Sequence, residues 1–426
     1  MNETTSRDPV PKTDWGDVAS LLEVARKLGA TLDLDTLVAE IQEAALSTLQ
    51  CERVSLFLFD TESDELWSRF ATGSSEIRFP ASAGIAGETL SSGRVINVPD
   101  AYRDVRFNPE VDRTTGFVTR SILSVPMFGY DGTPVGVLQV LNKKNGAFTE
   151  HDESVAETFC SLTGVVVQRQ LLLMELEEKQ KLMRDLAVAR GIQQSFLPDH
   201  APVVDGYSIA GWNRPAEETG GDCYDFVEFP ENRAGFLLAD ATGHGIGPAL
   251  MASQCRALIR GVVSATGDLS EAIETTNRIL NKDLRPGLFL TVFLGYLDHQ
   301  ASEIRYVSAG QGPILLFRRR TGERILFDAT TTPLGIFPFI DASVSEPVKL
   351  EPGDVFVVAS DGFFEWQDPD GEEFGTDRMF DMIERAEEAS ASDIIHLTRS
   401  AVVEFARGTK QDDDLTVVVV VRSKGQ

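Results

Sequence analysis

Cysteine, histidine and long apolar runs are all scarce in this chain of 426 residues. Its four cysteines are Cys51, Cys160, Cys223 and Cys255, and their wide spacing excludes a disulfide framework and a thiolate metal site. We expect them to be reduced and mostly buried. The longest purely aliphatic stretches, such as residues 417–421, are far shorter than the roughly 20 residues that cross a bilayer, so no transmembrane helix is predicted.

Basic residues are also few compared with acidic ones. The chain has 39 Lys and Arg residues against 66 Asp and Glu residues, a formal net charge of −27. Such a surface repels nucleic acid and anionic membranes, which excludes both as partners, and it favours basic or neutral substrates over acidic ones. Residues 1–15 are polar and of mixed charge, unlike a secretory signal, so a cytoplasmic location is expected.

The length predicts two or three domains, and the first has an α+β pattern. Helical periodicity in residues 21–25 and 37–49 is followed by strand-like runs at 54–59, 124–128 and 135–141. The last two runs flank the dipeptide Asp131-Gly132, which is typical of an antiparallel hairpin.

One long helix is predicted over residues 152–197, because the segment has no proline and only two glycines, Gly164 and Gly191. A heptad seam runs along it at Leu172, Leu176, Met183 and Leu186. Lys179 interrupts this seam, so two interpretations stay open: a short parallel coiled coil between two copies of the chain, or a helix packed on its own domain. Pro198 ends the helix.

The rest of the chain predicts a second α+β domain. Short β runs occur at residues 236–238, 290–297, 314–317, 355–359 and 415–421, and helical patterns at 248–264, 269–283, 377–388 and 392–407.

Four places with carboxylates stand out in this second domain, three of them at the end or start of a β run. They lie in the segments Gly220-Gly221-Asp222, Asp240 to Gly245, Ser360-Asp361-Gly362 and Asp412 to Thr416. Any one of them is ordinary turn chemistry. If separate strands bring them to one point, however, cations must offset their repulsion, and hard oxygen ligands suit Mg²⁺ or Mn²⁺. Two such ions can activate a water for phosphoester hydrolysis.

These motifs, in this order, resemble the PPM family of metal-dependent protein serine/threonine phosphatases, in particular its bacterial RsbU-like regulators. The matching positions are Asp222 with Tyr224 and Asp225, Asp240 with Gly243-His244-Gly245, Asp361-Gly362 with Glu365, and Asp413-Asp414-Leu415-Thr416. The resemblance implies a two-sheet sandwich flanked by helices. Its implied substrate is a phosphoserine or phosphothreonine on a small regulator of the anti-anti-sigma-factor type.

The resemblance also assigns the site residues. Asp222, Asp240, Asp361 and Asp413 would ligate two metal ions, Mn²⁺ or Mg²⁺, with Asp240 bridging both and the Ala241 carbonyl as a backbone ligand. In the family a metal-activated water attacks directly, so no serine or cysteine need be a nucleophile and Cys223 is a bystander. His244, between two glycines, is either structural or an acid or ligand.

Two positions depart from the family pattern. Gln311 stands where this branch usually has histidine, and Ala241 replaces a commonly larger aliphatic residue. Neither change removes a carboxylate ligand, so catalytic function is still expected.

The first domain resembles a GAF domain, over residues 17–170. The resemblance rests on Gly84-Ile85-Ala86-Gly87 and on the segments 107–117 and 122–126. Asn142-Lys143, Phe148 and Asp152-Glu153 match the signature of cyclic-nucleotide-binding GAF domains, as scaffold residues in which Lys143 pairs with Asp152. Three alternatives stay open: a cyclic nucleotide, another small molecule, or a dimerisation platform without ligand.

The sequence as a whole therefore predicts a signalling phosphatase with a GAF sensor at residues 17–170, a helical linker at 171–197 and a PPM-type domain at 198–424. The GAF domain would regulate the phosphatase through the linker, in a homodimer. The competing hypotheses are a catalytically silent scaffold and a small-molecule phosphohydrolase. Retention of all four aspartates favours an enzyme.

Overall fold

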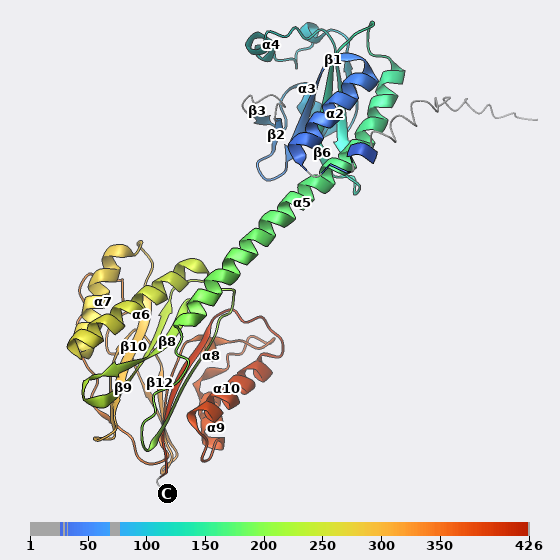
Figure 1. Cartoon of the computed structure of the whole chain (residues 1–426). Coiled ribbons are helices and arrows are strands. Elements are labelled where there is room, and N and C mark those ends of the chain that lie inside the picture. The colour runs from blue at the N-terminus through green and yellow to red at the C-terminus, as the bar shows by residue number, and fades with distance from the viewer. Residues whose placement is uncertain (1–25, 29, 32, 69–76, 425–426) are drawn as a thin grey trace, which may run out of the picture. The chain divides into compact units, whose positions relative to one another are not determined.

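The computed structural model describes residues 26–28, 30–31, 33–68 and 77–424, and these divide into two compact units that meet between Lys181 and Leu182 (Figure 1). The predicted first helix at residues 21–25 and the predicted start of the GAF domain at residue 17 lie outside the described residues. Each unit is described by itself below.

The first unit is built on a six-stranded antiparallel sheet with the order β3-β2-β1-β6-β5-β4. The strands are β1 Cys51–Asp60, β2 Glu65–Ser68, β3 Ile77–Pro80, β4 Ile96–Val98, β5 Ile122–Phe128 and β6 Pro134–Lys143. The helices are α2 Leu34–Leu49, α3 Gly84–Ser92, the 3-10 turn Ala101–Arg103, α4 Glu110–Thr115 and the start of α5 Glu150–Phe196. The predicted hairpin is present, since β5 and β6 pair antiparallel around Asp131-Gly132.

Apolar side chains of α2 and α5 cover one face of this sheet. Leu37, Ile41 and Phe159 are buried in one core with the strand residues Leu56 and Leu138. The helix α2 begins at a strong cap, because the Asp33 carboxylate accepts a hydrogen bond from the Thr36 backbone nitrogen at 2.8 Å. Burial of this helical face and of the facing strands accounts for the core of the unit.

A buried ion pair ties the last strand to the long helix, as predicted for Lys143 and Asp152. The Lys143 Nζ lies 2.6 Å from the Asp152 carboxylate and also donates to the Leu49 carbonyl at 3.1 Å. Burial raises the pKa of Asp152, but the hydrogen bonds from Lys143 and from Thr149 outweigh it and lower that pKa below its usual range. The signature residues are therefore scaffold contacts in this structure.

The helix α5 is 47 residues long and extends from the first unit into the second. By length and composition alone, one window of 18 residues in it is apolar enough to cross a membrane. In the structure 39% of that window is buried inside the protein, and buried core helices meet the same criterion, so the support for a membrane span is weak.

The second unit is a sandwich of two five-stranded antiparallel sheets, with strand orders β14-β11-β10-β9-β8 and β13-β12-β15-β16-β7. The strands are β7 Tyr207–Arg214, β8 Asp222–Phe229, β9 Arg233–Ala241, β10 Leu290–Asp298, β11 Glu303–Ala309, β12 Ile314–Arg318, β13 Glu323–Phe327, β14 Val348–Lys349, β15 Val355–Ala359 and β16 Leu415–Arg422. The helices are the 3-10 turn Pro230–Asn232, α6 Ile246–Thr266, α7 Leu269–Asp283, α8 Gly362–Glu365, α9 Gly375–Arg385 and α10 Ala391–Ala406.

Three buried layers hold the sandwich together. Between the sheets, the rings of Phe236, Phe293 and Phe356 pack against one another with centroids 5.6–6.3 Å apart, Phe236 and Phe293 stacked and Phe356 edge-on or tilted to them. The helices α6 and α7 cover the outer face of the first sheet, and α9 and α10 cover that of the second (Figure 1). This α+β architecture confirms the predicted fold class in both units. All four cysteines are buried and free, as expected.

The two glycines of α5 give a matched test of packing. A Cβ atom at Gly164 would lie 2.3 Å from the Phe128 carbonyl oxygen, whereas one at Gly191 would meet nothing within 4 Å. We expect Gly164→Ala to destabilise the first unit by about 1–3 kcal/mol through overpacking. Gly191→Ala should be neutral or stabilising by up to about 1 kcal/mol, because alanine favours the helix. Urea unfolding followed by circular dichroism measures both, and equal effects of the two substitutions would contradict the expectation.

Candidate active site

The strand order brings the four predicted aspartates to one edge of the sandwich, namely the end at which their strands begin or stop. Asp222 begins β8 and is paired with Asp240, near the end of β9, in direct register. In the other sheet, β15 ends at Ala359, two residues before Asp361, and β16 begins at Leu415, two residues after Asp413. Because β15 and β16 run antiparallel with Ala359 opposite Val417, Asp361 and Asp413 lie at the same end of that sheet.

The electrostatics of these carboxylates show that they form one interacting group. Asp222 is 3% exposed, and burial together with the charges of Asp240 and Asp414 raises its pKa well above the usual range. Burial and the charges of Asp361 and Asp413 raise the pKa of Asp240 to about 7. Burial, followed by the charge of Asp413, raises the pKa of Asp361 to about 6. Each carboxylate therefore resists ionisation because it is buried and because its neighbours are negative.

The donor set at this edge fits a divalent cation. Asp222 Oδ2 is buried without a hydrogen-bond partner, although a buried carboxylate oxygen normally has one. Gly221 lets its backbone approach the Ala241 carbonyl oxygen, from which a Cβ there would lie only 2.7 Å. Oxygen ligands of this kind suit Mg²⁺ or Mn²⁺. Within the described ranges, however, no three His, Cys, Asp or Glu side chains already form a closed ligand group.

Asp414 fixes the loop that carries Asp222, a contribution that the sequence analysis did not recognise. Its Oδ1 accepts a hydrogen bond from the Ala216 nitrogen at 2.7 Å and its Oδ2 one from the Asp222 nitrogen at 3.1 Å. Gly220 permits this approach, because a Cβ there would lie 2.3 Å from Asp414 Oδ2. The available signal in the sequence was the adjacent pair Asp413 and Asp414. The Asp413 carboxylate interacts with Asp240, and the Asp414 carboxylate binds the loop.

Gln311 joins the two sheets directly behind the aspartates. Its Oε1 accepts a hydrogen bond from the Thr291 hydroxyl at 2.7 Å, and its Nε2 donates to the Ala359 carbonyl at 2.9 Å. Thr291 is paired with Asp240 across β9 and β10, and Ala359 precedes Asp361 by two residues. The departure from histidine at this position therefore keeps a side chain that can both donate and accept a hydrogen bond.

His244 and Cys223 lie near the carboxylates but have other surroundings. The His244 side chain is 80% exposed and its Nδ1 lies 3.1 Å from a Glu217 carboxylate oxygen. Cys223 is buried, and burial raises the pKa of its thiol well above the usual range, which leaves it protonated and a poor nucleophile. The Cys223 thiol donates to the Ala252 carbonyl at 3.6 Å, so within the described residues neither side chain hydrogen-bonds to a predicted metal ligand.

The end of α5 contacts the loop that carries Asp222. Gln193 Nε2 donates to the Gly220 carbonyl at 2.6 Å, and the Gly220 nitrogen donates back to Gln193 Oε1 at 3.2 Å. Arg190 lies 3.4 Å from Glu218 of the same loop. The sequence placed this segment in the helical linker and gave Gln193 no role, because a glutamine on a polar helix carries no distinguishing signal.

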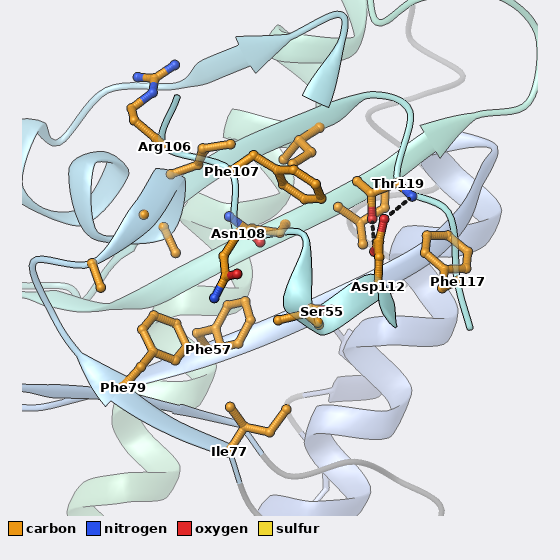
Figure 2. Close-up of a pocket in the computed structure, with 18 of the residues that line it drawn as sticks. Ser55, Phe57, Ile77, Phe79, Arg106, Phe107, Asn108, Asp112, Phe117 and Thr119 are labelled. Atoms are coloured by element: carbon orange, nitrogen blue, oxygen red, sulfur yellow. Dashed lines mark hydrogen bonds between the residues drawn. The ribbon is translucent and has the colours of Figure 1, made fainter. Parts of the chain in front are cut away.

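A separate pocket of about 400 Å³ lies in the first unit (Figure 2). Aromatic side chains form much of its wall, namely Phe57, Phe79, Phe107 and Phe117. Polar groups also line it, among them Arg53, Asn108 and Gln139. Asp112 is held in place because the Thr119 hydroxyl and backbone nitrogen each donate to it at 2.7 Å.

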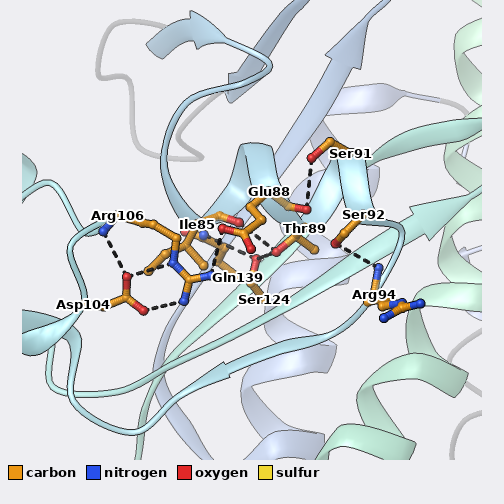
Figure 3. A network of polar contacts seen from close by, with 10 residues as sticks. All are labelled: Ile85, Glu88, Thr89, Ser91, Ser92, Arg94, Asp104, Arg106, Ser124 and Gln139. Atoms are coloured by element: carbon orange, nitrogen blue, oxygen red, sulfur yellow. Dashed lines mark hydrogen bonds and ion pairs between the residues drawn. The ribbon is translucent and has the colours of Figure 1, made fainter.

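Polar contacts anchor the helix α3, which borders this pocket (Figure 3). Arg106 donates to Glu88 of α3 at 2.8 Å and also pairs with Asp104. The buried Thr89 hydroxyl donates to the Ser124 hydroxyl of β5 at 2.8 Å, and Gln139 Nε2 of β6 donates to that Ser124 hydroxyl at 3.4 Å. These contacts fix the pocket wall to the sheet.

The repulsion at the sheet edge predicts a pH dependence of stability. The pKa of Asp240 rises to about 7 in the folded chain from an ordinary value of 3.8, so between those values the folded state binds protons that the unfolded state does not. Lowering the pH from about 8 to about 6 should therefore stabilise the second unit when a chelator is present. Thermal unfolding measures the effect.

A matched pair of variants isolates this effect from the general acidity of the chain. Asp240→Asn should weaken the pH dependence, whereas Asp377→Asn, at an exposed aspartate on α9, should retain it. A pH dependence unchanged in Asp240→Asn would contradict the assignment.

Comparison with known proteins agrees with the two units. Residues 33–167 match the model of the GAF domain, and residues 230–423 match that of Stage II sporulation protein E, SpoIIE. The SpoIIE match includes Asp240, Asp361 and Asp413, and Asp222 precedes it. The SiaA-PP2C domain of Pseudomonas aeruginosa has a similar structure, with a TM-score of 0.50 and 22% sequence identity over 57% of this chain and 97% of that chain.

Curated relatives share a shorter region. A probable 3',5'-cyclic phosphodiesterase pde-5 of Caenorhabditis elegans is 32% identical over 179 residues, 38% of this chain and 24% of that protein. A cGMP-specific 3',5'-cyclic phosphodiesterase of Drosophila sechellia is 34% identical over 190 residues, 40% of this chain and 16% of that protein. The chain thus spans less than a quarter of the length of either relative. On the family matches and the fold, the chain joins a GAF domain to a PP2C-type protein phosphatase domain of the SpoIIE kind.

Proposed function

We propose that the second unit hydrolyses phosphoserine or phosphothreonine on a partner protein with the help of two Mn²⁺ or Mg²⁺ ions. The observation that carries this proposal is the pairing of Asp222 with Asp240, with Asp222 Oδ2 buried and unpartnered. A carboxylate in that position is costly unless a cation balances it. A bound cation would thus stabilise a pair of buried carboxylates that otherwise only destabilises the fold.

Each site residue has a defined part in this chemistry. Asp222, Asp240, Asp361, Asp413 and the Ala241 carbonyl would hold the ions. When bound, divalent cations supply a water of lowered pKa and offset the charge of the phosphoryl group. Asp414 and Gln311 act on the other residues, because they keep the loop and the two sheets in register. The buried thiol of Cys223 takes no part.

The substrate we propose is a small regulator protein of the anti-anti-sigma-factor type, as the resemblance to RsbU-like phosphatases implies. A catalytically silent scaffold would have no need for the four aspartates, all of which are present. A small-molecule phosphohydrolase would use the same aspartates, so substrate comparison distinguishes it from a protein phosphatase.

We propose that the GAF domain controls this site through α5. Support comes from the two hydrogen bonds between Gln193 and Gly220, because a shift of the helix end would move the loop that carries Asp222. The exposed apolar side chains Leu172, Leu176 and Met183 support the proposal that α5 pairs with α5 of a second copy. A monomeric mass in light scattering at micromolar concentration would contradict the homodimer.

A second candidate function is binding of a cyclic nucleotide in the GAF pocket. The pocket combines flat aromatic walls, which suit a purine, with the guanidinium of Arg53, which suits a phosphate. Two of the similar proteins carry names that refer to cyclic nucleotide phosphodiesterases.

The phosphatase proposal is tested by phosphate release from a phosphoserine peptide with added Mn²⁺. Asp361→Asn should reduce turnover by about 100-fold or more, since loss of even an outer partner of a metal ligand costs up to about 100-fold. Asp377→Asn is the matched control and should retain activity. Inertness of the unchanged protein on peptides and on p-nitrophenyl phosphate would favour the scaffold; turnover of small phosphate esters alone would favour the phosphohydrolase.

The ligand proposal is tested by the thermal unfolding of the first unit with cAMP, cGMP or 5'-AMP. A cyclic nucleotide at 100 times its Kd should stabilise that unit by about 2.7 kcal/mol. Asn108→Ala, in the pocket wall, should weaken the response, whereas Asn145→Ala, an exposed residue outside it, should not. No shift with either cyclic nucleotide, and no nucleotide retained in native mass spectrometry, would contradict the proposal.

A further inference from the structure

We propose that a groove beside the aspartate edge of the second unit binds an acidic segment of the phosphoprotein substrate; this inference rests on the proposed function. The groove has a volume of about 490 Å³. Its lining consists of Trp212 and Arg214 from β7 and of Arg399, Ser400, Val403 and Glu404 from α10. It is called the β7–α10 groove below.

The lining follows from the regular geometry of the two elements. Trp212 and Arg214 are two residues apart on a strand, so they project from the same face of the sheet. Arg399 and Val403, like Ser400 and Glu404, are four residues apart and share one face of the helix. The strand β7 is at the edge of its sheet, so no further strand covers this side.

The groove contains two arginines whose positive charge no carboxylate of the described residues neutralises. In the part of the chain that the structure describes, neither Arg214 nor Arg399 has a carboxylate partner, whereas Arg233, Arg318 and Arg407 each have at least one. The guanidinium of Arg399 lies over the Trp212 ring, 5.1 Å from its centroid. Glu404 is the one acidic residue in the lining. Two unpaired guanidinium groups in a chain of net charge −27 form a local site for an anion.

Direct contacts connect the groove to the aspartates. The carbonyl of Arg214 accepts a hydrogen bond from Gln411 Nε2 at 3.1 Å, and the same amide donates to the Asp413 carbonyl at 2.9 Å. On the other side, the Trp212 ring packs edge-on against Phe363, with centroids 6.2 Å apart, and Phe363 follows Asp361 by two residues. An extended peptide advances about 3.3 Å per residue, so a few residues link the aspartate edge to the groove.

The chemistry of the groove favours an acidic peptide segment as its occupant. A phosphoserine carries a charge of about −1.5 to −2 at neutral pH, so the surface of this chain repels its substrate at long range. Carboxylates flanking the phosphoserine could pair with Arg214 and Arg399 in the geometry that guanidinium groups prefer. Val403, which is 43% exposed, and Trp212 offer an apolar wall for a neighbouring side chain. A free phosphate ion would use the arginines but not this wall.

The test compares two phosphoserine peptides that differ only in their flanking residues, aspartate in one and asparagine in the other. Arg399→Gln should lower kcat/KM for the aspartate peptide about tenfold, mainly through KM, and Arg399→Glu should lower it further. The asparagine peptide and p-nitrophenyl phosphate should respond little to either variant. Arg385→Gln on α9 removes the same charge from an exposed position outside the groove and should leave all three substrates unchanged.

The other outcomes each overturn the groove proposal in a recognisable way. Equal losses on all three substrates would show that Arg399 supports the fold rather than the substrate. Unchanged kinetics in Arg399→Glu would show that the groove is unused. If inorganic phosphate inhibited the Arg399 variants less, without any peptide preference, the occupant would be the product anion. If Arg399→Glu changed the mass of the protein in light scattering, the occupant would be a second copy of the chain. Inertness of the unchanged protein on every substrate would instead refute the proposed function itself.

Discussion

Mutual repulsion of aspartates at one edge of the sandwich is the constraint around which the second unit is organised. Asp222 and Asp240 face each other across β8 and β9, while Asp361 and Asp413 approach from the other sheet. Burial makes the repulsion stronger, because it removes the water that would screen it. The apolar layers between and outside the sheets must hold these groups together, and a divalent cation of the kind proposed would turn the repulsion into coordination.

Hydrogen bonds to backbone groups and from side-chain amides keep this edge in shape. Asp414 accepts hydrogen bonds from the backbone of the loop that ends at Asp222, and Gln311 links the strand beside Asp240 to the strand that precedes Asp361. Gln193 of α5 pairs with both backbone polar atoms of Gly220. The geometry of the aspartates therefore depends on residues outside the predicted ligand set, and one of them belongs to the long helix α5.

Strands could be predicted best from the sequence where an unbroken apolar run marks them. The runs that became β12, β15 and β16 are almost purely apolar, so their burial on both faces could be predicted from composition alone. The strand β8 was not predicted, because Asp222, Asp225 and Glu228 interrupt its apolar residues. Asp225 is tolerated there since Arg256 and Arg260 of α6 pair with it, and such partners from a distant helix leave no mark in the local sequence.

The sequence by itself determined the α+β class of both units and the long helix, because periodicity is a local property, and its resemblance to a known family pointed to the candidate aspartates. Only the tertiary structure decided which side chains meet. The register of β8 against β9 places Asp222 opposite Asp240, and the packing of α10 on β7 creates the groove with its two unpaired arginines. Contacts of this kind join residues as far apart as Trp212 and Arg399, and their positions depend on the packing of the whole core rather than on any segment.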